Sequence, residues 1–339
     1  MKYQINQLPN SQIEIKIELN KDDLFPYKEK ALKELAKNVK VDGFREGRVP
    51  LEIVETKIPP LELAEKTASF AIEEIYPKII IEEKINALGY PEINITKIIP
   101  NQELEFKVKV AVLKEIILPD YKSIAKEEKK NKKIEVSVTE KEIEEALKWI
   151  YLSRSQNKTE KPEEMKIDDE FARSLGNFEN LEALKKSIKE GIEMEKKQKE
   201  EEKWRMGLLE KIMEKIEWNL PEVLIQAEIH KMIDELKMKL DDMGLPFEKY
   251  LEQIKKNEED LKKDLKEPAE KRVKIALILR EITIKENISA SEKEIEERVD
   301  RIISQVDEDL KTKIDLEQLK SFVSNLVENE KVFSFLENL

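Results

Sequence analysis

The N-terminal part of the chain carries the pattern of a small sheet and two helices. Apolar and polar side chains alternate, as in strands with one buried face, in residues 12–19, 90–98 and 104–113. After Asn20, a favourable N-cap residue, apolar side chains recur at helical spacing, and a second helix is predicted from about Leu61 to Lys84. These elements predict an α+β domain over residues 1–118, with a small antiparallel sheet and two main helices.

From residue 137 onward the pattern is helical. A capping box of Thr139 and Glu142 begins the first of these helices. The later helices are predicted over residues 181–216, 222–241, 246–254, 258–285, 291–304 and 315–337. Their lengths and mixed faces predict a mainly α-helical, arm-like domain over residues 137–339.

Two segments lack an apolar pattern. Residues 119–136 contain the charge run SIAKEEKKNKK and are predicted to form a linker. Residues 153–166, SRSQNKTEKPEEMK, are polar and unpatterned, which is typical of a short connector inside the helical domain.

Composition narrows the classes of function. Charged residues make up 40% of the 339 residues and the formal net charge is −12, which argues against a general nucleic-acid binder, DNA included, because such a field repels phosphate; a local basic patch is left open. No cysteine is present, the first residues, MKYQINQLPN, lack the apolar stretch expected of a signal peptide, and no apolar run is long enough to span a membrane. We therefore expect a cytoplasmic protein that does not associate with membranes.

The ordinary signatures of enzymes are missing as well. The single histidine, His230, lies in a helical pattern and is interpreted as an ordinary helix residue rather than a catalytic base. With seven glycines in the chain, the sequence contains neither a P-loop nor a GxGxxG motif. No catalytic residue, metal site or cofactor is predicted.

One loop is far more specific than the rest of the chain. It follows the GFRxGxxP pattern, and its residues are Gly43, Phe44, Arg45, Glu46, Gly47, Arg48, Val49 and Pro50. The loop resembles the ribosome-binding signature of the trigger factor family, the bacterial ribosome-associated chaperones. Further segments that resemble this family follow in its order, namely DDEFARSLGN at 168–177, LPEVLIQAEIHKMIDELKMKL at 220–240, EPAEKRVKIALILREITIKENI at 267–288 and ENEKVFSFL near the end.

The resemblance implies an ATP-independent chaperone that docks beside the ribosomal exit tunnel, through protein and rRNA, and shields nascent polypeptides during folding and export. It also implies a link to cell division. The ribosome-binding residues carried over from the family are Gly43, Phe44, Arg45, Glu46, Gly47, Arg48 and Pro50. Whether the free protein forms a weak homodimer is left open.

The chemistry of the loop suits that role. Gly43 and Gly47 permit the turns that project a tip, Phe44 offers apolar surface, and Arg45 with Arg48 can contact phosphates or a carboxylate. The alternative is that Gly43 ends one helix and Pro50 begins the next, with Phe44 in the core.

The loop region departs from the family in two places. Glu46 stands where the family often has a basic or neutral residue, and Ile58-Pro59-Pro60 replaces a more usual glycine-containing turn. We expect both changes to affect ribosome affinity rather than ribosome binding as such.

The family usually carries a prolyl-isomerase domain of the FK506-binding type, between the capped helix and the DDEFA stretch. Here that interval is residues 153–166, whereas an autonomous domain needs roughly 50 residues. The interval contains no Phe, Tyr or Trp to line a proline pocket. We therefore expect a form of the family without prolyl-isomerase activity (EC 5.2.1.8).

Methionine is distributed unevenly, since every methionine after Met1 lies at or beyond Met165. Flexible methionine side chains suit surfaces that accept varied apolar partners. The candidate client-binding residues are Met194, Met206, Met213, Met232, Met238 and Met243. The alternative for each of them is ordinary packing between helices.

Three other functions are weighed against a ribosome-bound chaperone. A cytosolic holdase or assembly chaperone that does not use the ribosome needs the same helical cradle. A helical scaffold for one partner is disfavoured because the chain shows no sustained heptad seam. A prolyl isomerase is disfavoured because the interval at residues 153–166 is too short for the isomerase domain.

Overall fold

The computed structural model describes residues 1–37, 39, 50–131, 136–154, 166–306, 311 and 314–339. These residues group by their contacts into two compact units, which are described separately. The first unit comprises Met1–Ile117 with Glu217–Leu277, and the second comprises Leu118–Ile216 with Ile278–Leu339. The boundaries expected from the sequence, at residues 118 and 137, remain a proposal about how the chain divides into folding units.

The first unit contains an antiparallel sheet with the strand order β1-β2-β4-β3. The strands are β1 (Lys2–Leu8), β2 (Gln12–Asn20), β3 (Ala87–Ile99) and β4 (Glu103–Val112). The register pairs Ile15 with Val108 and Ile17 with Phe106, and all four side chains are buried. The alternation seen in the sequence therefore places one apolar face of β2 and β4 in the core.

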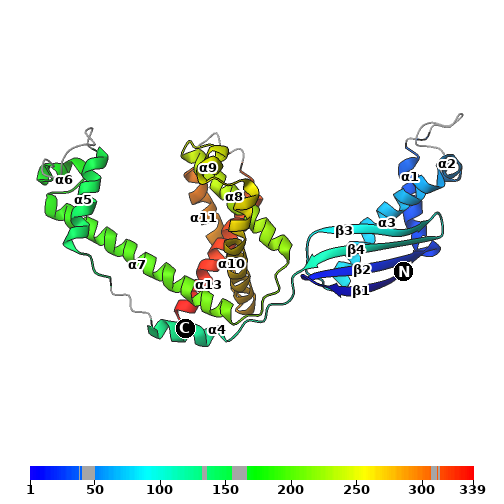
Figure 1. The fold of residues 1–339 in the computed structure, drawn as a ribbon, viewed down its shortest axis with the longest axis horizontal. Helices are drawn as coiled ribbons and strands as arrows, with labels where there is room; N and C mark the ends of the chain where they lie inside the picture. The colour runs from blue at the N-terminus through cyan, green and yellow to red at the C-terminus, as the bar shows by residue number, and fades with distance from the viewer. Residues whose placement is uncertain (38, 40–49, 132–135, 155–165, 307–310, 312–313) are drawn as a thin grey trace. The chain divides into compact units, whose positions relative to one another are not determined.

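Three helices accompany the sheet, α1 (Lys21–Leu35), α2 (Leu51–Lys57) and α3 (Pro60–Glu82). Figure 1 shows α1 and α3 on one face of the sheet, where Ala68, Ala71 and Ile75 of α3 join the buried cluster of the strands. The predicted N-cap is confirmed, because the Asn20 side chain accepts from the backbone N–H of Asp23, whose carboxylate accepts from the N–H of Asn20.

The remainder of the first unit is helical. It consists of α8 (Glu222–Asp242), α9 (Phe247–Ile254) and the first part of α10 (Glu258–Lys285). Ile225, Ile229 and Ile233 form one apolar stripe of α8 that packs against α10. Gly244, with φ +68°, lies just beyond the end of α8, in a conformation that glycine adopts at little cost.

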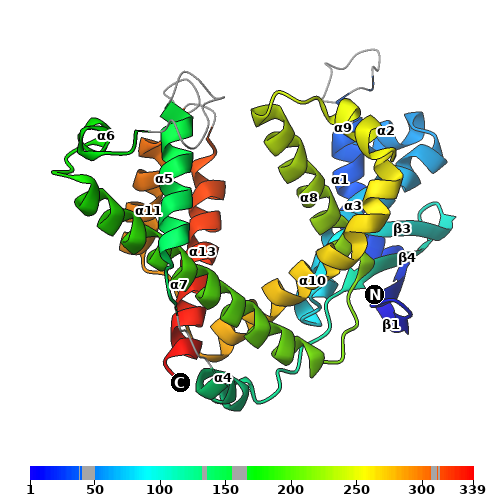
Figure 2. The same ribbon diagram turned by 60° about the vertical axis from the view of Figure 1, so that its left-hand side comes forward.

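The second unit is built from helices. They are α4 (Tyr121–Asn131), α5 (Glu140–Arg154), α6 (Asp169–Leu175), α7 (Leu181–Glu214), α11 (Glu292–Ser304), α13 (Leu316–Glu337) and the end of α10. The α11–α13 pair, visible in Figure 2, encloses Val299, Val323 and Val327. A second cluster, around Leu147 and Leu184, joins α5, α6 and α7.

The expected fold class is confirmed: a small antiparallel sheet with helices is followed by a mainly helical region. The strand β1 and the short helices α2 and α6 were not predicted from the sequence. No helix among the described residues is both long and apolar enough to cross a bilayer.

The segment expected to be a linker is instead largely helical. Residues 121–131 form α4, and Tyr121, Ile124 and Ala125 are buried. Their spacing of three and four residues gives α4 an apolar stripe, which the surrounding lysines and glutamates hide in the sequence. The expected connector at 153–166 lies mostly outside the described residues, because α5 ends at Arg154 and residues 155–165 are not described.

Two capping boxes in the second unit make its stability depend on pH. The carboxylate of Glu142 accepts hydrogen bonds from the hydroxyl and the backbone N–H of Thr139 and pairs with Lys196. The carboxylate of Glu294 accepts from the same two groups of Ser291 and pairs with Lys331. In each case the lysine contributes most, and the pKa of the carboxyl falls to about 2 from an ordinary 4.5.

A lowered folded-state pKa stabilises the protein above the unfolded value, and this contribution is lost as the pH falls from about 4.5 to about 2. A Glu142→Gln, Glu294→Gln variant keeps hydrogen-bonding side chains but removes both charges. We expect it to melt below the wild type at pH 7, with the difference shrinking towards pH 2. Thermal melts at several pH values test this, and a constant difference would contradict it.

Candidate functional site

The GFRxGxxP segment lies between α1 and α2 in the sequence of the first unit. Residues 43–49 lie outside the described residues, so the structure does not place the side chains from Gly43 to Arg48. Pro50 is described: it is exposed and occupies the N-cap position of α2, with φ −54° and ψ 136°. Because its pyrrolidine ring fixes φ, Pro50 sets the direction in which the chain enters α2.

One apolar cluster holds the two flanks of this segment together. Ala31, Leu32 and Ala36 reach it from the end of α1. Val54 and Ile58 reach it from the other side of the segment, and Val54 is fully buried. The cluster, which we call the loop clamp, also contains Leu63 of α3. It packs the described chain that precedes the signature segment, up to Val39, against the chain that follows it.

The Ile58-Pro59-Pro60 departure is compatible with this base. Ile58 is extended and 7% exposed, Pro59 is the N-cap of α3 and Pro60 is its first residue. Proline suits the first turn of a helix because the missing N–H has no helical partner there. The double proline thus ends α2 and starts α3 directly, while Ile58 packs in the loop clamp.

The methionines differ in exposure. Met194, Met238 and Met243 expose 71%, 61% and 75% of their surface, and Met206 exposes 40%. Met232 packs against the apolar cluster of α8 and α10, and Met213 is partly buried. Met238 and Met243 belong to the first unit and the other two exposed methionines to the second. The exposed four fit a client-binding role better than Met213 and Met232 do.

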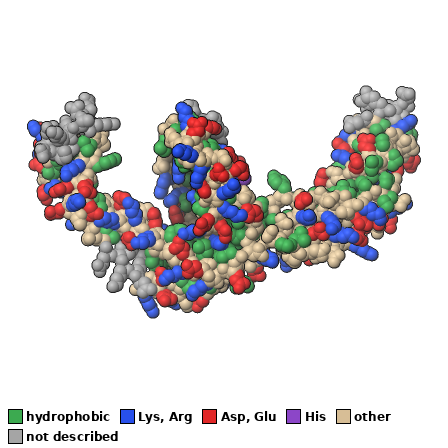
Figure 3. Space-filling view, viewed as in Figure 1, with side chains coloured by type: hydrophobic (Ala, Val, Ile, Leu, Met, Phe, Trp, Pro, Cys, Tyr) green, Lys and Arg blue, Asp and Glu red, His purple; other side chains and the backbone are tan. Residues whose placement is uncertain are grey.

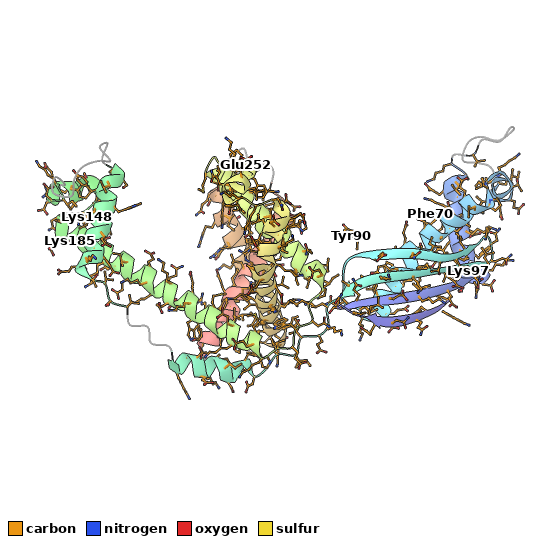
Figure 4. The ribbon with its side chains drawn as sticks, in the orientation of Figure 1. Phe70, Tyr90, Lys97, Lys148, Lys185 and Glu252 are labelled. Atoms are coloured by element: carbon orange, nitrogen blue, oxygen red, sulfur yellow. The ribbon has the colours of Figure 1, made fainter. Side chains whose placement is uncertain are left out.

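Other exposed apolar side chains were not singled out from the sequence. In the second unit Trp149, Leu316 and Phe322 expose 72%, 52% and 59% of their surface. In the first unit the edge strand β3 carries Tyr90, which points away from the sheet in Figure 4 and is fully exposed. Exposed apolar residues mark interaction sites where they form a contiguous patch, and a single one gives no distinctive signal in a sequence.

The surroundings of these side chains are strongly charged. Figure 3 shows acidic and basic side chains interspersed over the visible face, with apolar side chains between them. Many of the charges form ion pairs, for example Arg272 with Glu228 and Glu235 at 3.3 and 3.0 Å. Such pairs at the surface add little stability but keep apolar side chains in a solvated setting.

The residue chemistry gives no sign of an active site in the part of the chain that is described. His230 is exposed on α8, where its Nδ1 lies 2.6 Å from the carbonyl oxygen of Gln226, one turn earlier. This is the environment of an ordinary helix residue. Among the described residues no group of three or more acidic, histidine or cysteine side chains is placed to hold a metal ion.

Comparison with known proteins identifies the family. The family model described as bacterial trigger factor protein matches residues 1–150, and that of the trigger factor C-terminus matches residues 180–337. The chain belongs to the trigger factor family. The resemblance read from the sequence is thereby confirmed, and so is membership of a family of chaperones.

Individual relatives agree with the family models. The trigger factor of Clostridium kluyveri is 24% identical over 427 residues, covering 99% of this chain and 98% of the relative. That of Clostridium botulinum strain Hall is 24% identical over 393 residues, covering 90% of each chain. A solved structure of the trigger factor chaperone, studied for promiscuous substrate recognition in folding and assembly, has a TM-score of 0.58 at 17% identity. It covers 100% of this chain and 99% of its own, which shows a shared fold.

Proposed function

We propose that this member of the trigger factor family is an ATP-independent chaperone that docks at the ribosomal exit tunnel and shields nascent polypeptides. Its site of action is then the cytoplasm, where nascent chains emerge. The observation that carries the docking proposal is the loop clamp, which holds both flanks of the Gly43–Pro50 segment on one packed base. Because packing holds the described chain on either side of the segment, we propose that the segment loses less conformational entropy on binding than an unanchored chain would.

Docking through this segment is expected to be weak and reversible. Arg45 and Arg48 are the only basic side chains within Gly43–Pro50, so at most about two phosphates are neutralised. Each neutralised phosphate contributes a log–log salt slope of about −0.7 to −0.9. Co-sedimentation of the purified protein with ribosomes in a salt series tests the proposal, and the expected slope is no steeper than about −2.

Shielding of clients is supported by the exposed apolar side chains among mixed charges. Met194, Met238 and Met243 offer flexible contacts that accept varied partners. The neighbouring charges keep each apolar contact small, so a bound segment dissociates readily. Because the sequence holds no P-loop, release is proposed to follow from weak affinity and from folding of the client rather than from nucleotide hydrolysis.

We further propose that the protein has no prolyl-isomerase activity. Residues 151–179 lie between the two matched family segments, fewer than an autonomous domain needs. The alignment with the C. kluyveri relative spans 427 residues, whereas this chain has 339. The relative therefore contains segments that this protein lacks.

Refolding of a proline-limited substrate measures the isomerase activity directly. Uncatalysed isomerisation takes tens to hundreds of seconds at 25 °C, and we expect the purified protein to leave this rate unchanged. A homologue that contains the isomerase domain is the positive control. Acceleration that grows with the concentration of this protein would contradict the proposal.

A further inference from the structure

The first unit contains an apolar pocket at a place that the family signature does not include. It opens between α1, α3 and the turn that joins β3 to β4, and its volume is about 130 Å³. Leu24 and Phe25 line it from α1, Leu63, Ala64 and Ala68 from α3, and Ile98 from β3. The two alanines leave room where larger side chains would fill the space between the helices.

The interior offers few polar groups to a ligand. Thr67 is the one hydroxyl-bearing residue of the lining, and its Oγ1 donates to the carbonyl oxygen of Leu63 at 2.7 Å. Its hydrogen-bonding capacity is thus engaged within α3. An apolar group that enters the pocket leaves no buried donor unsatisfied, and it covers Phe25, which otherwise exposes 59% of its surface.

The volume selects the size of the group. An engineered apolar cavity of about 150 Å³ in another protein stays dry and binds benzene. A pocket of about 130 Å³ therefore accepts one six-membered ring. A phenylalanine side chain fits this description.

The charges around the pocket favour an acidic neighbour of that ring. Lys28 is paired with Glu55 at 2.6 Å, and Glu103 is paired with Lys97, which Figure 4 labels on β3. Lys21 is exposed and has no carboxylate partner among the described residues. Among the charged residues that line the pocket, the one without an opposite partner is therefore a lysine.

We propose that this pocket is a client subsite that takes one phenylalanine ring of an unfolded polypeptide and prefers a ring flanked by Asp or Glu. The proposal rests on the proposed chaperone function, which it deepens by naming a recognition element of the client. It adds a subsite next to the sheet to the helical surfaces that carry the exposed methionines.

Binding of short peptides to the full-length protein tests the subsite. The probe is a fluorescein-labelled, otherwise Gly/Ser-rich peptide with a single Phe between two Asp residues, compared with its Phe→Ala and Asp→Lys versions. Burying a phenylalanine ring is expected to make the Phe peptide bind about tenfold to hundredfold more tightly than the Ala peptide. Equal affinities of the Phe and Ala peptides would overturn the proposal.

A matched pair of variants locates the binding. Ala64→Leu fills the pocket, whereas Glu65→Leu adds the same side chain at the neighbouring, exposed position of α3. We expect Ala64→Leu to weaken binding of the Phe peptide about tenfold or more, and Glu65→Leu to leave the affinity for this peptide unchanged. Lys21→Glu should remove the preference for Asp over Lys flanks. If the Ala64→Leu variant binds the Phe peptide as tightly as wild type does, the assignment of the subsite to this pocket is contradicted.

A readout on the wild-type protein keeps the test valid if Ala64→Leu folds poorly. The methyl NMR signals of Ile98 should shift on addition of the Phe peptide and not of the Ala peptide, and unshifted signals would overturn the subsite. If Ala64→Leu changes the oligomeric state but not the peptide affinity, the pocket belongs to contact between two copies and the client assignment is wrong.

Suppression of aggregation separates the two proposals. If wild type suppresses the aggregation of a denatured protein but binds the Phe and Ala peptides equally, the subsite fails and the chaperone function stands. If wild type does not suppress aggregation, the chaperone function itself fails, whatever the peptides show.

Discussion

Replacing Phe44, Arg45 and Glu46 together with alanine should abolish co-sedimentation of the protein with ribosomes. The change removes the aromatic ring and one of the two guanidinium groups of the signature segment. Truncation of an aromatic or arginine hot spot typically costs about 2 kcal/mol or more, so the loss should exceed tenfold. The fold should be unaffected, because the described residues that form the loop clamp come from the end of α1, from α2 and from α3 and are all unchanged.

The control is an exposed phenylalanine elsewhere in the chain. Phe322 on α13 exposes 59% of its surface, and Phe322→Ala should pellet with ribosomes as wild type does. Circular dichroism checks that both variants retain their helices. Pelleting of the triple variant at wild-type levels would show that the protein reaches the ribosome by another surface, or that its binding is unspecific.

Replacing Tyr121 with alanine should destabilise the second unit by about 3–5 kcal/mol, the usual cost of deleting a buried aromatic side chain. Tyr121 is 2% exposed, and its hydroxyl donates to Glu286 at 2.5 Å. The Nζ of Lys285 lies 5.3 Å from the centre of its ring. Burial and the bond to Glu286 raise the pKa of Tyr121, so the hydroxyl stays protonated as a donor.

Tyr121 anchors α4, and contacts with α7 also hold this helix. The Nε1 of Trp204 donates to the carbonyl oxygen of Glu128 at 3.2 Å, and Lys211 pairs with the carboxylate of that residue. Loss of the Tyr121 ring should therefore release α4 first. Hydrogen exchange should increase most in residues 121–131 and in the end of α10.

Tyr121→Phe is the matched control. It keeps the ring and loses the bond to Glu286, which still pairs with Lys122 at 2.8 Å, so a cost of only about 1–2 kcal/mol is expected. Denaturant unfolding measures both variants. If Tyr121→Ala is as stable as Tyr121→Phe, the ring does not anchor α4 and the packing described for this helix is wrong.

The elements that the sequence predicted well are those whose pattern matches their burial. Residues 12–19 alternate strictly and form β2, and the capping box at Thr139 begins a helix as expected. The strand β1 was missed because Tyr3 and Ile5 are its only inward apolar side chains, both partly buried at a sheet edge. Two apolar positions do not distinguish a strand from a loop.

The helix α4 was missed for a different reason. Nearly every residue from 126 to 133 is charged, so the segment has the composition of a solvated linker. Tyr121, Ile124 and Ala125 nonetheless form a short apolar stripe, and Tyr121 donates a hydrogen bond to Glu286, which follows α10 far along the chain. Tertiary contacts of this kind leave no mark in the local pattern.

The signature segment could be found from the sequence because its glycines, proline and aromatic–arginine pair occur in a fixed order. The pocket of the first unit could not, since it arises where Ala64 and Ala68 meet the turn between β3 and β4. Alanines in a helix have many roles, and an empty space between elements is not encoded by any single motif.

Photo-crosslinking to a stalled ribosome–nascent-chain complex tests the central claim most directly. A photoreactive amino acid at Met238, Met243 or Met194, all exposed, should crosslink to the nascent chain. The crosslinks should disappear when Phe44, Arg45 and Glu46 are alanine, because the protein is then no longer held at the exit. Crosslinks of equal yield with and without the three side chains would contradict a chaperone tethered through this segment.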